Sequence, residues 1–261
     1  MHNYLTSILA ETQRHVDKLK MEVEKNAEHP LHATHLSPTK SLKQALSQPK
    51  INIIAEIKRN SPSKGQLAEI KDPVELAQKY YQAGAAAISV LTNQVGFNGS
   101  LQDLNAIANA LKSTPCAILR KDFIIDDIQI PEAIYYGADA VLLIVAVTQR
   151  QTLELLNVCR QYRIDALVEV HTAEELELAL EFGAEIIGIN NRNLSTFNID
   201  TETALRLKPL IPKHIISVAE SGITSEKTAE SYIEAGFNAL LIGEALVKSK
   251  DPKQFISDLR L

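Results

Sequence analysis

The chain has 261 residues, of which 45% are hydrophobic and 23% are charged. This composition is typical of a folded protein with a sizeable core, and the length suits two small domains or one α/β barrel of about 250 residues. The formal net charge of −5 does not favour nucleic-acid binding, which usually requires a basic surface. It does not exclude an anionic small molecule, because a few local cations can dominate one pocket.

Several further features predict a cytoplasmic location. The two cysteines, Cys116 and Cys159, lack CxxC spacing, and we interpret them as reduced thiols and not as a disulfide or a metal site. The first residues do not combine a basic region with an apolar core, so we expect no secretory signal. No apolar run approaches the roughly 20 residues that span a bilayer, and we expect no membrane contact.

The first 50 residues predict a helical extension that precedes the main domain. Apolar residues recur at helical spacing over residues 3–26, which predicts an amphipathic helix that docks on the rest of the protein. The loop that follows contains His29, His32 and His35. Their regular spacing would suit a metal site, but two prolines interrupt the segment and no carboxylate or cysteine completes a ligand set. We therefore interpret this loop as a solvated connector.

From residue 51 onward, strand-like and helix-like segments alternate regularly. Helix starts are marked by Asp72 before a proline, by Thr172 with a glutamate three residues later, and by Asp251 before a proline. The eight strand-like segments are 52–58, 86–92, 116–122, 140–146, 166–171, 185–191, 214–221 and 239–245.

Four glycines, Gly84, Gly137, Gly183 and Gly236, stand just before alternate strands and suit helix C-caps. Eight parallel strands with short connections indicate a closed (β/α)8 barrel. A doubly wound open sheet is the alternative, but the Gly-rich fingerprint that usually follows its first strand is missing. We predict that residues 1–261 form a single (β/α)8 TIM barrel domain, with 1–50 as an N-terminal helical extension and 51–261 as the barrel.

Polar residues gather where the predicted strands end. In such barrels these ends converge on one mouth, where the active site lies, so the residues are expected to meet although they are far apart in sequence. So many charges at one mouth are better explained by a site than by chance contact with solvent. The residues at the strand ends are Glu56, Lys58, Lys121, Glu169, Asn190, Arg192, Glu220, Ser221, Gly222, Gly243 and Glu244.

These residue types indicate an anionic substrate and acid–base chemistry. Lys121 opposite Glu169 suits a general acid and base pair; a static salt bridge across the mouth is the alternative. The turns that contain Gly222 and Gly243 follow the last two strands, where barrel enzymes often hold phosphate, although tight-turn geometry alone would also explain both glycines. The sequence suggests no metal-ligand set and no Cys-His or Ser-His-Asp arrangement.

The same residues lie in segments that resemble the indole-3-glycerol-phosphate synthase family, and the resemblance covers essentially the whole chain. Several of the matching segments are long, so together they are specific. The segments are Glu56-Ile57-Lys58-Arg59-Asn60-Ser61-Pro62-Ser63, Ser89-Val90-Leu91-Thr92, Phe97 with Gly99-Ser100, Leu119-Arg120-Lys121-Asp122-Phe123-Ile124-Ile125-Asp126, Glu169-Val170-His171, Gly188-Ile189-Asn190-Asn191-Arg192-Asn193-Leu194, Glu220-Ser221-Gly222-Ile223 and Ile242-Gly243-Glu244-Ala245-Leu246.

The resemblance implies a decarboxylating ring closure in tryptophan biosynthesis that uses no cofactor and no metal. The substrate would be the phosphosugar 1-(2-carboxyphenylamino)-1-deoxyribulose 5-phosphate, which would lose carbon dioxide and water to give indole-3-glycerol phosphate. By resemblance Lys121 is the general acid for ring closure, and Glu169 is the acid/base partner in the later dehydration. The N-terminal helix would help to close the mouth.

The remaining residues take roles in catalysis, substrate binding and phosphate binding, again by resemblance. Glu56 and Lys58 would line the reacting centre, while Asn190 and Glu220 would position the substrate. Ser61 and Arg192 would manage the substrate carboxylate, and Phe123 and Leu194 are candidates for the apolar walls. The phosphate would lie at Ser221, Gly222, Gly243 and Glu244, mainly on backbone N–H groups. A carboxylate repels phosphate, so we expect the Glu244 side chain to turn away.

Two rival functions remain. A related phosphosugar barrel, phosphoribosylanthranilate isomerase, is expected to use a cysteine base early in the barrel and an aspartate acid late, whereas the first strand here offers Glu56 and Lys58. A non-catalytic barrel that binds a phosphosugar is the rival of a different class, and it predicts no turnover. We expect a monofunctional, monomeric enzyme.

Overall fold

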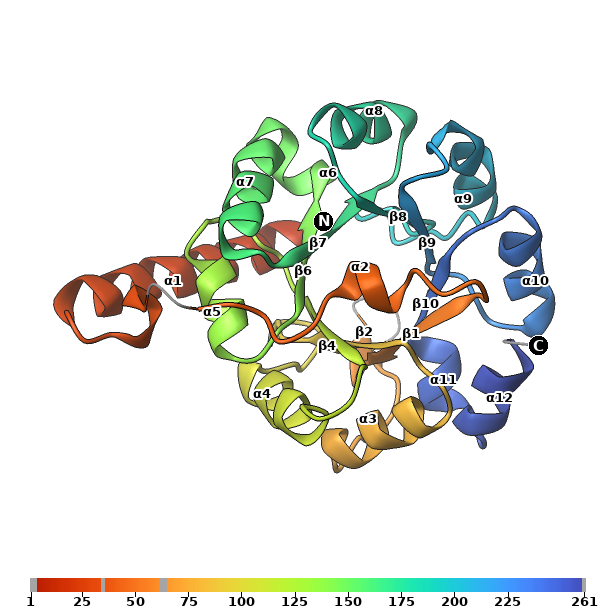
Figure 1. Ribbon diagram of the computed structural model, residues 1–261, viewed down its shortest axis with the longest axis horizontal. Helices are drawn as coiled ribbons and strands as arrows, with labels where there is room; N and C mark the ends of the chain where they lie inside the picture. Colours follow the sequence, from red (N-terminus) through yellow and green to blue (C-terminus); the bar gives the residue numbers. More distant parts are fainter. Residues whose placement is uncertain (1–3, 34–35, 62–64, 260–261) are drawn as a thin grey trace.

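The computed structural model describes residues 4–33, 36–61 and 65–259. Its centre is a closed barrel of eight parallel strands, in the order β1-β10-β9-β8-β7-β6-β5-β4 with β4 paired back to β1 (Figure 1). Strand and helix alternate around it, so the predicted (β/α)8 barrel is confirmed. The barrel strands are β1 Asn52–Ile57, β4 Ala87–Leu91, β5 Ala117–Lys121, β6 Ala140–Ile144, β7 Asp165–Val170, β8 Ile186–Asn190, β9 Ile216–Glu220 and β10 Ala239–Ile242.

Helices form a ring outside the barrel, as Figure 1 shows. They are α3 Pro73–Gln82, α4 Leu101–Ala110, α5 Gln129–Tyr135, α7 Thr152–Tyr162, α8 Ala173–Glu181, α9 Glu202–Leu207, α10 Glu226–Glu234 and α12 Pro252–Asp258. Two short helices follow strands directly: α6 Val145–Thr148 after β6, and α11 Glu244–Lys248 after β10. There are also three 3-10 turns, Pro30–His32, Gln149–Gln151 and Lys208–Leu210. A small hairpin pairs β2 Asn60–Ser61 with β3 Gly65–Gln66.

Two strands end at earlier residues than predicted. The fourth strand was expected to reach Ala146 and the eighth Ala245, but they stop at Ile144 and Ile242, where α6 and the turn before α11 begin. The fourth segment remains apolar across the boundary, so hydrophobicity alone gives no signal there for the change from strand to helix, whereas Gly243 and Glu244 already interrupt the apolar run of the eighth.

The predicted helix starts are confirmed by their hydrogen bonds. Asp72 accepts from the N–H groups of Val74 and Glu75 at the start of α3, and Thr172 and Asp251 cap α8 and α12 in the same way. The four predicted C-cap glycines all have positive φ, from 73° at Gly183 to 100° at Gly84. In this region a Cβ is unfavourable, which explains glycine at the point where each helix turns back toward the sheet.

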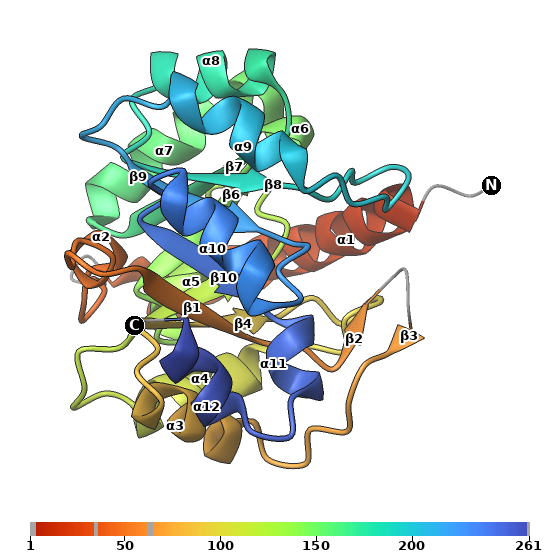
Figure 2. The same cartoon turned by 90° about the vertical axis from the view of Figure 1, so that its right-hand side faces the viewer.

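The N-terminal segment closes the barrel at both ends. Helix α1 (Tyr4–Lys25) confirms the expected amphipathic helix, and the four-residue α2 (Leu42–Ala45) follows it. Figure 2 shows α2 at one end of the barrel and α1, with the β2–β3 hairpin, at the other. Ile8 of α1 and Leu42 of α2 belong to the same buried cluster as Leu119 and Leu167 inside the barrel.

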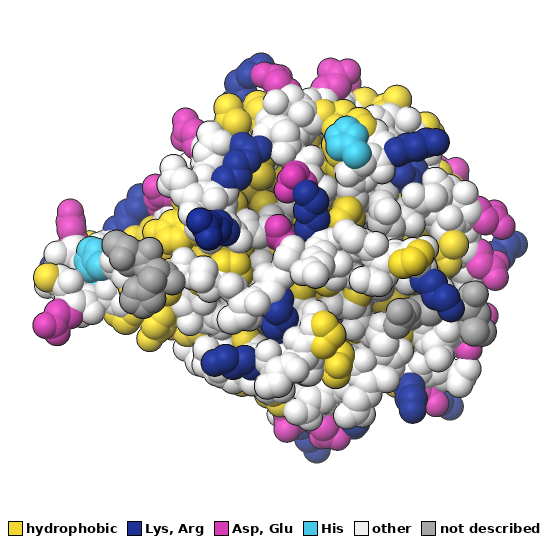
Figure 3. Space-filling view, in the orientation of Figure 1, with side chains coloured by type: hydrophobic (Ala, Val, Ile, Leu, Met, Phe, Trp, Pro, Cys, Tyr) yellow, Lys and Arg dark blue, Asp and Glu magenta, His cyan; other side chains and the backbone are white. Residues whose placement is uncertain are grey.

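The charges on the α2 face are mixed in sign, with Lys and Arg interspersed among Asp and Glu (Figure 3). Both cysteines are free and buried, and burial raises the pKa of each thiol to about 12. Within the described ranges, no helix has the length and apolar character that crossing a membrane requires. His35, Pro62 and Ser63, which the sequence analysis named, lie outside the described residues.

Candidate active site

The predicted site residues all line one cavity at the carboxyl ends of the strands. The strand register brings them together: Ile144 pairs with Glu169, and Asn190 pairs with Glu220. The expected convergence of distant segments is therefore found. The predicted residues that line the cavity are Glu56, Lys58, Ser61, Lys121, Phe123, Glu169, Asn190, Arg192, Leu194, Glu220, Ser221, Gly222, Gly243 and Glu244.

Lys121 lies at the centre of the charged groups. Its Nζ is 3.3 Å from Glu169 Oε2 and 3.5 Å from Glu220 Oε2. Both carboxylates are almost fully buried, at 1% exposure each. A buried charge is costly unless it is compensated, and the lysine and the carboxylates compensate each other here. Lys121 and Glu169 thus lie within direct reach for proton exchange.

The same burial and charges separate the pKa values of these groups. Burial alone would lower the pKa of Lys121, but the charges of Glu169, Glu220 and Glu56 outweigh it and raise that pKa above its ordinary value. Burial raises the pKa of Glu220 to about 8, with the Glu169 charge acting in the same direction. Burial also opposes ionisation of Glu169, yet the charges of Lys121 and His171 leave its pKa lowered. At neutral pH the site therefore holds a charged lysine, an ionised Glu169 and a protonated Glu220.

Glu56 and Lys58 share a face of β1 and its exit, as their spacing predicted. Lys58 Nζ is 3.3 Å from Glu56 Oε1 and lies 5.5 Å from the centroid of the Phe97 ring. This places the ammonium between a carboxylate and an aromatic face, where a cation is favoured. The pair forms a second charged group beside Lys121.

Two glycines make room for the carboxylates. A Cβ on Gly188 would lie 2.0 Å from Glu220 Oε1, and one on Gly243 would lie 2.6 Å from Glu56 Oε1. Gly243 has a φ of −116°, so the tight-turn explanation does not apply to it. Gly222 does have a left-handed φ of 78°, and it follows Ser221 with a φ of 64°. The sequence reasoning had not singled out Gly188 as part of the site.

The two turns predicted to bind phosphate lie side by side, because β9 and β10 are adjacent strands. Ser221 and Gly222 follow β9, and Gly243 and Glu244 follow β10. Glu244 Oε1 pairs with Lys248 Nζ at 2.7 Å, one helical turn further along α11.

Aromatic and apolar side chains form a wall of the cavity that the sequence only partly predicted. Phe123 and Leu194 were expected there, but helix α1 and the β8–α9 loop add further groups. The rings of Tyr4 and Phe197 meet edge to face, with centroids 5.8 Å apart. Leu5 and Ile8 belonged to the apolar stripe of α1, so the signal existed but did not specify what the stripe covers. The unpredicted apolar and aromatic lining residues include Tyr4, Leu5, Ile8, Leu91, Phe97, Phe197 and Ile199.

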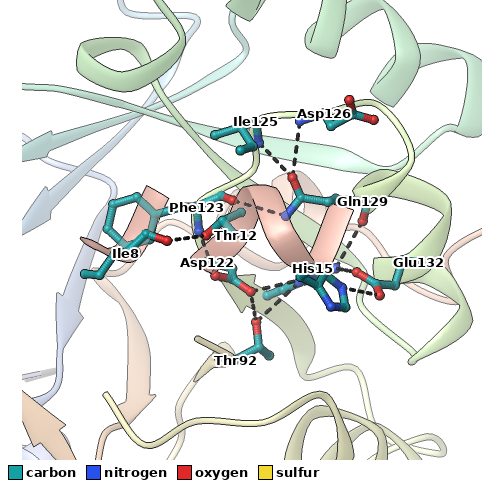
Figure 4. Close-up of polar contacts among 11 residues, drawn as sticks. Ile8, Thr12, His15, Thr92, Asp122, Phe123, Ile125, Asp126, Gln129 and Glu132 are labelled. Carbon is teal, nitrogen blue, oxygen red and sulfur yellow. Dashed lines mark hydrogen bonds and ion pairs between the residues drawn. The ribbon is translucent and has the colours of Figure 1, made fainter. Parts of the chain in front are cut away.

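A buried ionic network fixes the end of β5 that carries Lys121 (Figure 4). Arg120 is 1% exposed and contacts Glu132 Oε2 at 2.9 Å and Asp122 Oδ2 at 3.2 Å. The Gln129 side chain donates to Phe123 O and accepts from two N–H groups of the following loop. These contacts hold the residues on both sides of Lys121, and a well-compensated buried pair of this kind is costly to break.

The histidine-containing loop does not form a metal site in the described residues. His29 accepts a hydrogen bond from Leu31 N, and the His32 ring contacts Val23 O at 3.0 Å. Across residues 4–33, 36–61 and 65–259, no group of three or more His, Cys, Asp or Glu side chains is arranged to hold a metal ion.

The closed barrel, with its polar groups at the carboxyl ends of the strands and its glycine turns after the last two, defines a (β/α)8-barrel protein with an enzyme-type site. A solved structure of 3-hexulose-6-phosphate synthase from Salmonella typhimurium shares this fold, with a TM-score of 0.63 at 15% identity over 80% of this chain and 97% of that one. The likeness shows the fold alone.

Sequence comparison assigns the family. The profile of the family described as Indole-3-glycerol phosphate synthase matches residues 5–259. The indole-3-glycerol phosphate synthase of Kineococcus radiotolerans is 47% identical over 80% of this chain and 76% of its own. That of Rhodococcus jostii is 50% identical over 82% and 79%, respectively. The chain belongs to the indole-3-glycerol phosphate synthase family.

Proposed function

We propose that this protein is an indole-3-glycerol phosphate synthase, a carboxy-lyase of tryptophan biosynthesis. It closes the pyrrole ring of 1-(2-carboxyphenylamino)-1-deoxyribulose 5-phosphate and releases carbon dioxide and water. The observation that carries the proposal is the convergence of the family's charged strand-end residues on one cavity, around the buried Lys121. Identities near half with relatives of that name support the same reaction.

Ring closure needs a proton donor at the ketone oxygen. Lys121 supplies it, because the surrounding carboxylates keep its ammonium charged. The aromatic carbon that bears the carboxylate attacks the ketone carbon, and the ketone oxygen becomes a hydroxyl. Loss of carbon dioxide then returns its electron pair to the forming iminium, which restores the aromatic ring and requires no external oxidant.

Dehydration needs one group that removes a proton and one that donates a proton to the leaving hydroxyl. Glu169 is ionised and lies 3.3 Å from Lys121, so it acts as the base while a protonated neighbour assists departure of water. Glu220 is the second carboxyl and keeps its proton up to about pH 8. Two carboxyl groups with separated pKa values are the arrangement that such a step requires.

Binding uses the rest of the cavity. The phosphate is held by backbone N–H groups of the turns at Ser221, Gly222, Gly243 and Glu244, where glycine permits close approach. Phe123 and Leu194 hold the aromatic ring against the ketone carbon, which reduces the entropic cost of closure.

Cationic and polar groups of the cavity receive the substrate carboxylate. Arg192 is half-buried, and burial lowers its pKa without removing its charge. Ser61, Lys58 and Asn190 line the same cavity.

The isomerase alternative is disfavoured by the position of the cysteines. Cys116 and Cys159 are buried in the layer between the sheet and its helices, away from the cavity-lining residues. The first strand presents Glu56 and Lys58 to the cavity instead. We further propose that the chain works as one cytoplasmic, monomeric unit, with segment 1–50 forming part of the site.

The test is turnover of the carboxyphenylamino-deoxyribulose phosphate without added metal, followed by absorbance of the indole product. We expect product from the wild type and a loss of roughly 10²–10⁴-fold in kcat for Lys121→Ala. Lys18→Ala, which changes an exposed lysine of α1, serves as the matched control. Substrate binding without product in the folded wild type would support the non-catalytic barrel instead.

A further inference from the structure

His171 lies directly behind the reacting carboxylate. It follows Glu169 by two residues at the end of β7, so both side chains leave the same face. The imidazole Nε2 is 3.4 Å from Glu169 Oε1, and Nδ1 is 3.1 Å from Glu175 Oε2. The His171 side chain is 11% exposed and does not line the active-site cavity. It can therefore act on the substrate only through Glu169.

Glu175 determines which ring nitrogen carries a hydrogen. One of its oxygens, Oε2, accepts the backbone N–H of His171 at 2.6 Å and also faces Nδ1. A carboxylate held in this way is an acceptor, so Nδ1 is the protonated nitrogen of the ring. Thr172 caps the same helix and accepts from Glu175 N, which fixes the position of Glu175. The ring orientation thus follows from the start of α8.

The contact between Nε2 and Glu169 needs a proton to be favourable. Nε2 is buried and has no hydrogen-bond partner among the described residues, although Glu169 Oε1 is close. With Nδ1 protonated, a neutral ring would direct the lone pair of Nε2 at an ionised carboxylate. One proton, held either by Nε2 or by Glu169, converts this repulsion into a hydrogen bond.

The neighbouring charges agree with a shared proton. Burial would lower the pKa of His171, but its hydrogen bond to Glu175 and the charges of Glu169 and Glu175 leave it raised, against a smaller opposing effect of Lys121. Glu169 also forms side-chain hydrogen bonds with Asn190 on β8 and with Glu220 on β9, and Glu220 carries a proton itself at neutral pH. The short helix α6, which also packs against β7, contributes only Val, Ala and Thr side chains.

We propose that His171 is a positioning residue that shares one proton with Glu169, with Glu175 holding the ring in the required tautomer. This inference rests on the proposed function of Glu169. In the resting site Nε2 holds the shared proton and Glu169 is ionised. Transfer of this proton to Glu169, which breaks the N–H bond and forms an O–H bond, makes Glu169 an acid and leaves Nε2 with a free lone pair. A proton that Glu169 takes from the substrate after it has donated the first can then pass to Nε2, which restores the resting site. The series of contacts Glu175–His171–Glu169 therefore lets the Glu169 carboxyl group act both as an acid and as a base.

A test that does not depend on activity is the titration of the His171 ring by ¹⁵N NMR in the full chain. We expect its midpoint in the wild type to lie above the ordinary value of about 6.5. In Glu169→Gln it should fall by roughly one pH unit or more, because the shared proton loses one partner. A midpoint that is unchanged by Glu169→Gln would overturn the inference, whatever the enzyme's activity.

The kinetic test is the pH profile of His171→Gln, with the exposed His214→Gln as the matched control. We expect kcat to fall roughly tenfold with KM within about twofold. The acidic limb of kcat should move upward by roughly half to one pH unit, because Glu169 loses a neighbouring cation. A lower kcat with an unmoved profile would indicate a structural role only and would overturn the inference.

Glu175→Gln provides a second variant if His171→Gln is unstable. It should shift the acidic limb in the same direction by a smaller amount, whereas Glu177→Gln, on the exposed face of α8, should not. Equal profiles for these two variants would contradict the role of Glu175. Failure of the proposed function would appear differently, as absence of turnover in the wild type, while the NMR titration would still report on the shared proton.

Discussion

Two neighbouring carboxyl groups in this cavity have opposite protonation at neutral pH. Glu169 and Glu220 are both buried and both face Lys121. His171 and a hydrogen bond with Asn190 favour the ionised form of Glu169, whereas burial and the charge of Glu169 favour the protonated form of Glu220. The difference between the two acids therefore comes from the other residues around them, since their distances to the lysine are similar.

The raised pKa of Glu220 predicts a particular dependence of stability on pH. An ordinary Glu titrates at 4.5 and folded Glu220 at about 8, so the folded state binds the extra proton between these values. Stability from this group is fully present below about pH 4.5 and is lost as pH rises through 8. Glu220→Gln does not titrate, so its Tm relative to the wild type should increase from pH 5 to pH 8. Thermal unfolding at both pH values, with exposed Glu177→Gln as control, measures this; a constant difference would contradict it.

Gly188 gives a second prediction for a single residue. A Cβ there would lie 2.0 Å from Glu220 Oε1 and 3.2 Å from Leu167 Cδ1 in the barrel interior. Gly188→Ala should therefore lower the free energy of unfolding by about 1–3 kcal/mol and displace Glu220. In a Glu220→Ala background the same change should cost less, because the clashing atoms are gone. Equal costs measured by chemical denaturation in both backgrounds would exclude this explanation.

The site residues could be predicted from sequence because each stands at the end of a recognisable strand. Glu56, Lys121 and Glu169 needed only the strand pattern and the barrel rule. His171 also follows a strand, but its proposed role depends on a contact with Glu175, and this contact forms only because α8 begins where it does. Gly188 lies in mid-strand, where nothing in the sequence indicates that a carboxylate from the next strand needs its space.

Helix α1 connects the N-terminal segment to the catalytic strand. His15 Nε2 lies 2.7 Å from Glu132 Oε1 (Figure 4), and Glu132 also pairs with Arg120. Lys20 pairs with Asp126 in the loop after Lys121. The other end of α1 places Tyr4, Leu5 and Ile8 in the cavity wall. Docking of α1 thus contributes both to the ionic network at the end of β5 and to the apolar wall of the cavity.

Loss of the His15 contact should weaken this docking. The hydrogen bond and charge of Glu132 raise the pKa of His15 against the opposing effects of burial and Arg120; Asp122 acts with Glu132. Because the pKa of His15 is higher in the folded state than in the unfolded state, its protonation stabilises the fold fully below about pH 6.5. This stability is lost as pH rises through the pKa of the folded state. His15→Ala should therefore lower Tm more at pH 6 than at pH 9.

His15→Ala should also raise KM more than it lowers kcat. The part of the cavity wall that α1 contributes contacts the substrate, whereas Lys121 stays in place. Steady-state kinetics and thermal unfolding would measure both effects, with Lys18→Ala on the exposed side of α1 as control. A Tm difference that is independent of pH would show that the imidazole does not act through its charge.

The order of the elements was predictable from the strand and helix pattern, whereas closure of the mouth by α1 was implied only by the family resemblance. Alternating periodicity, caps and C-cap glycines identified eight strand–helix units, and the barrel rule supplied their arrangement. What α1 covers depends on tertiary contacts such as Tyr4 with Phe197, between residues far apart in the chain. Periodicity shows that a helix has an apolar face, but it does not show which surface receives that face.

For the proposed reaction, one cavity of the molecule must hold the aromatic ring, the reacting centre and the phosphate together. The most direct test is a crystal structure of the full chain with indole-3-glycerol phosphate bound. We predict the indole ring between Phe123 and Leu194, facing Lys121, and the phosphate on the backbone N–H groups of Gly222 and Gly243. Phosphate bound away from these two turns, or a ring that does not face Lys121, would contradict the account.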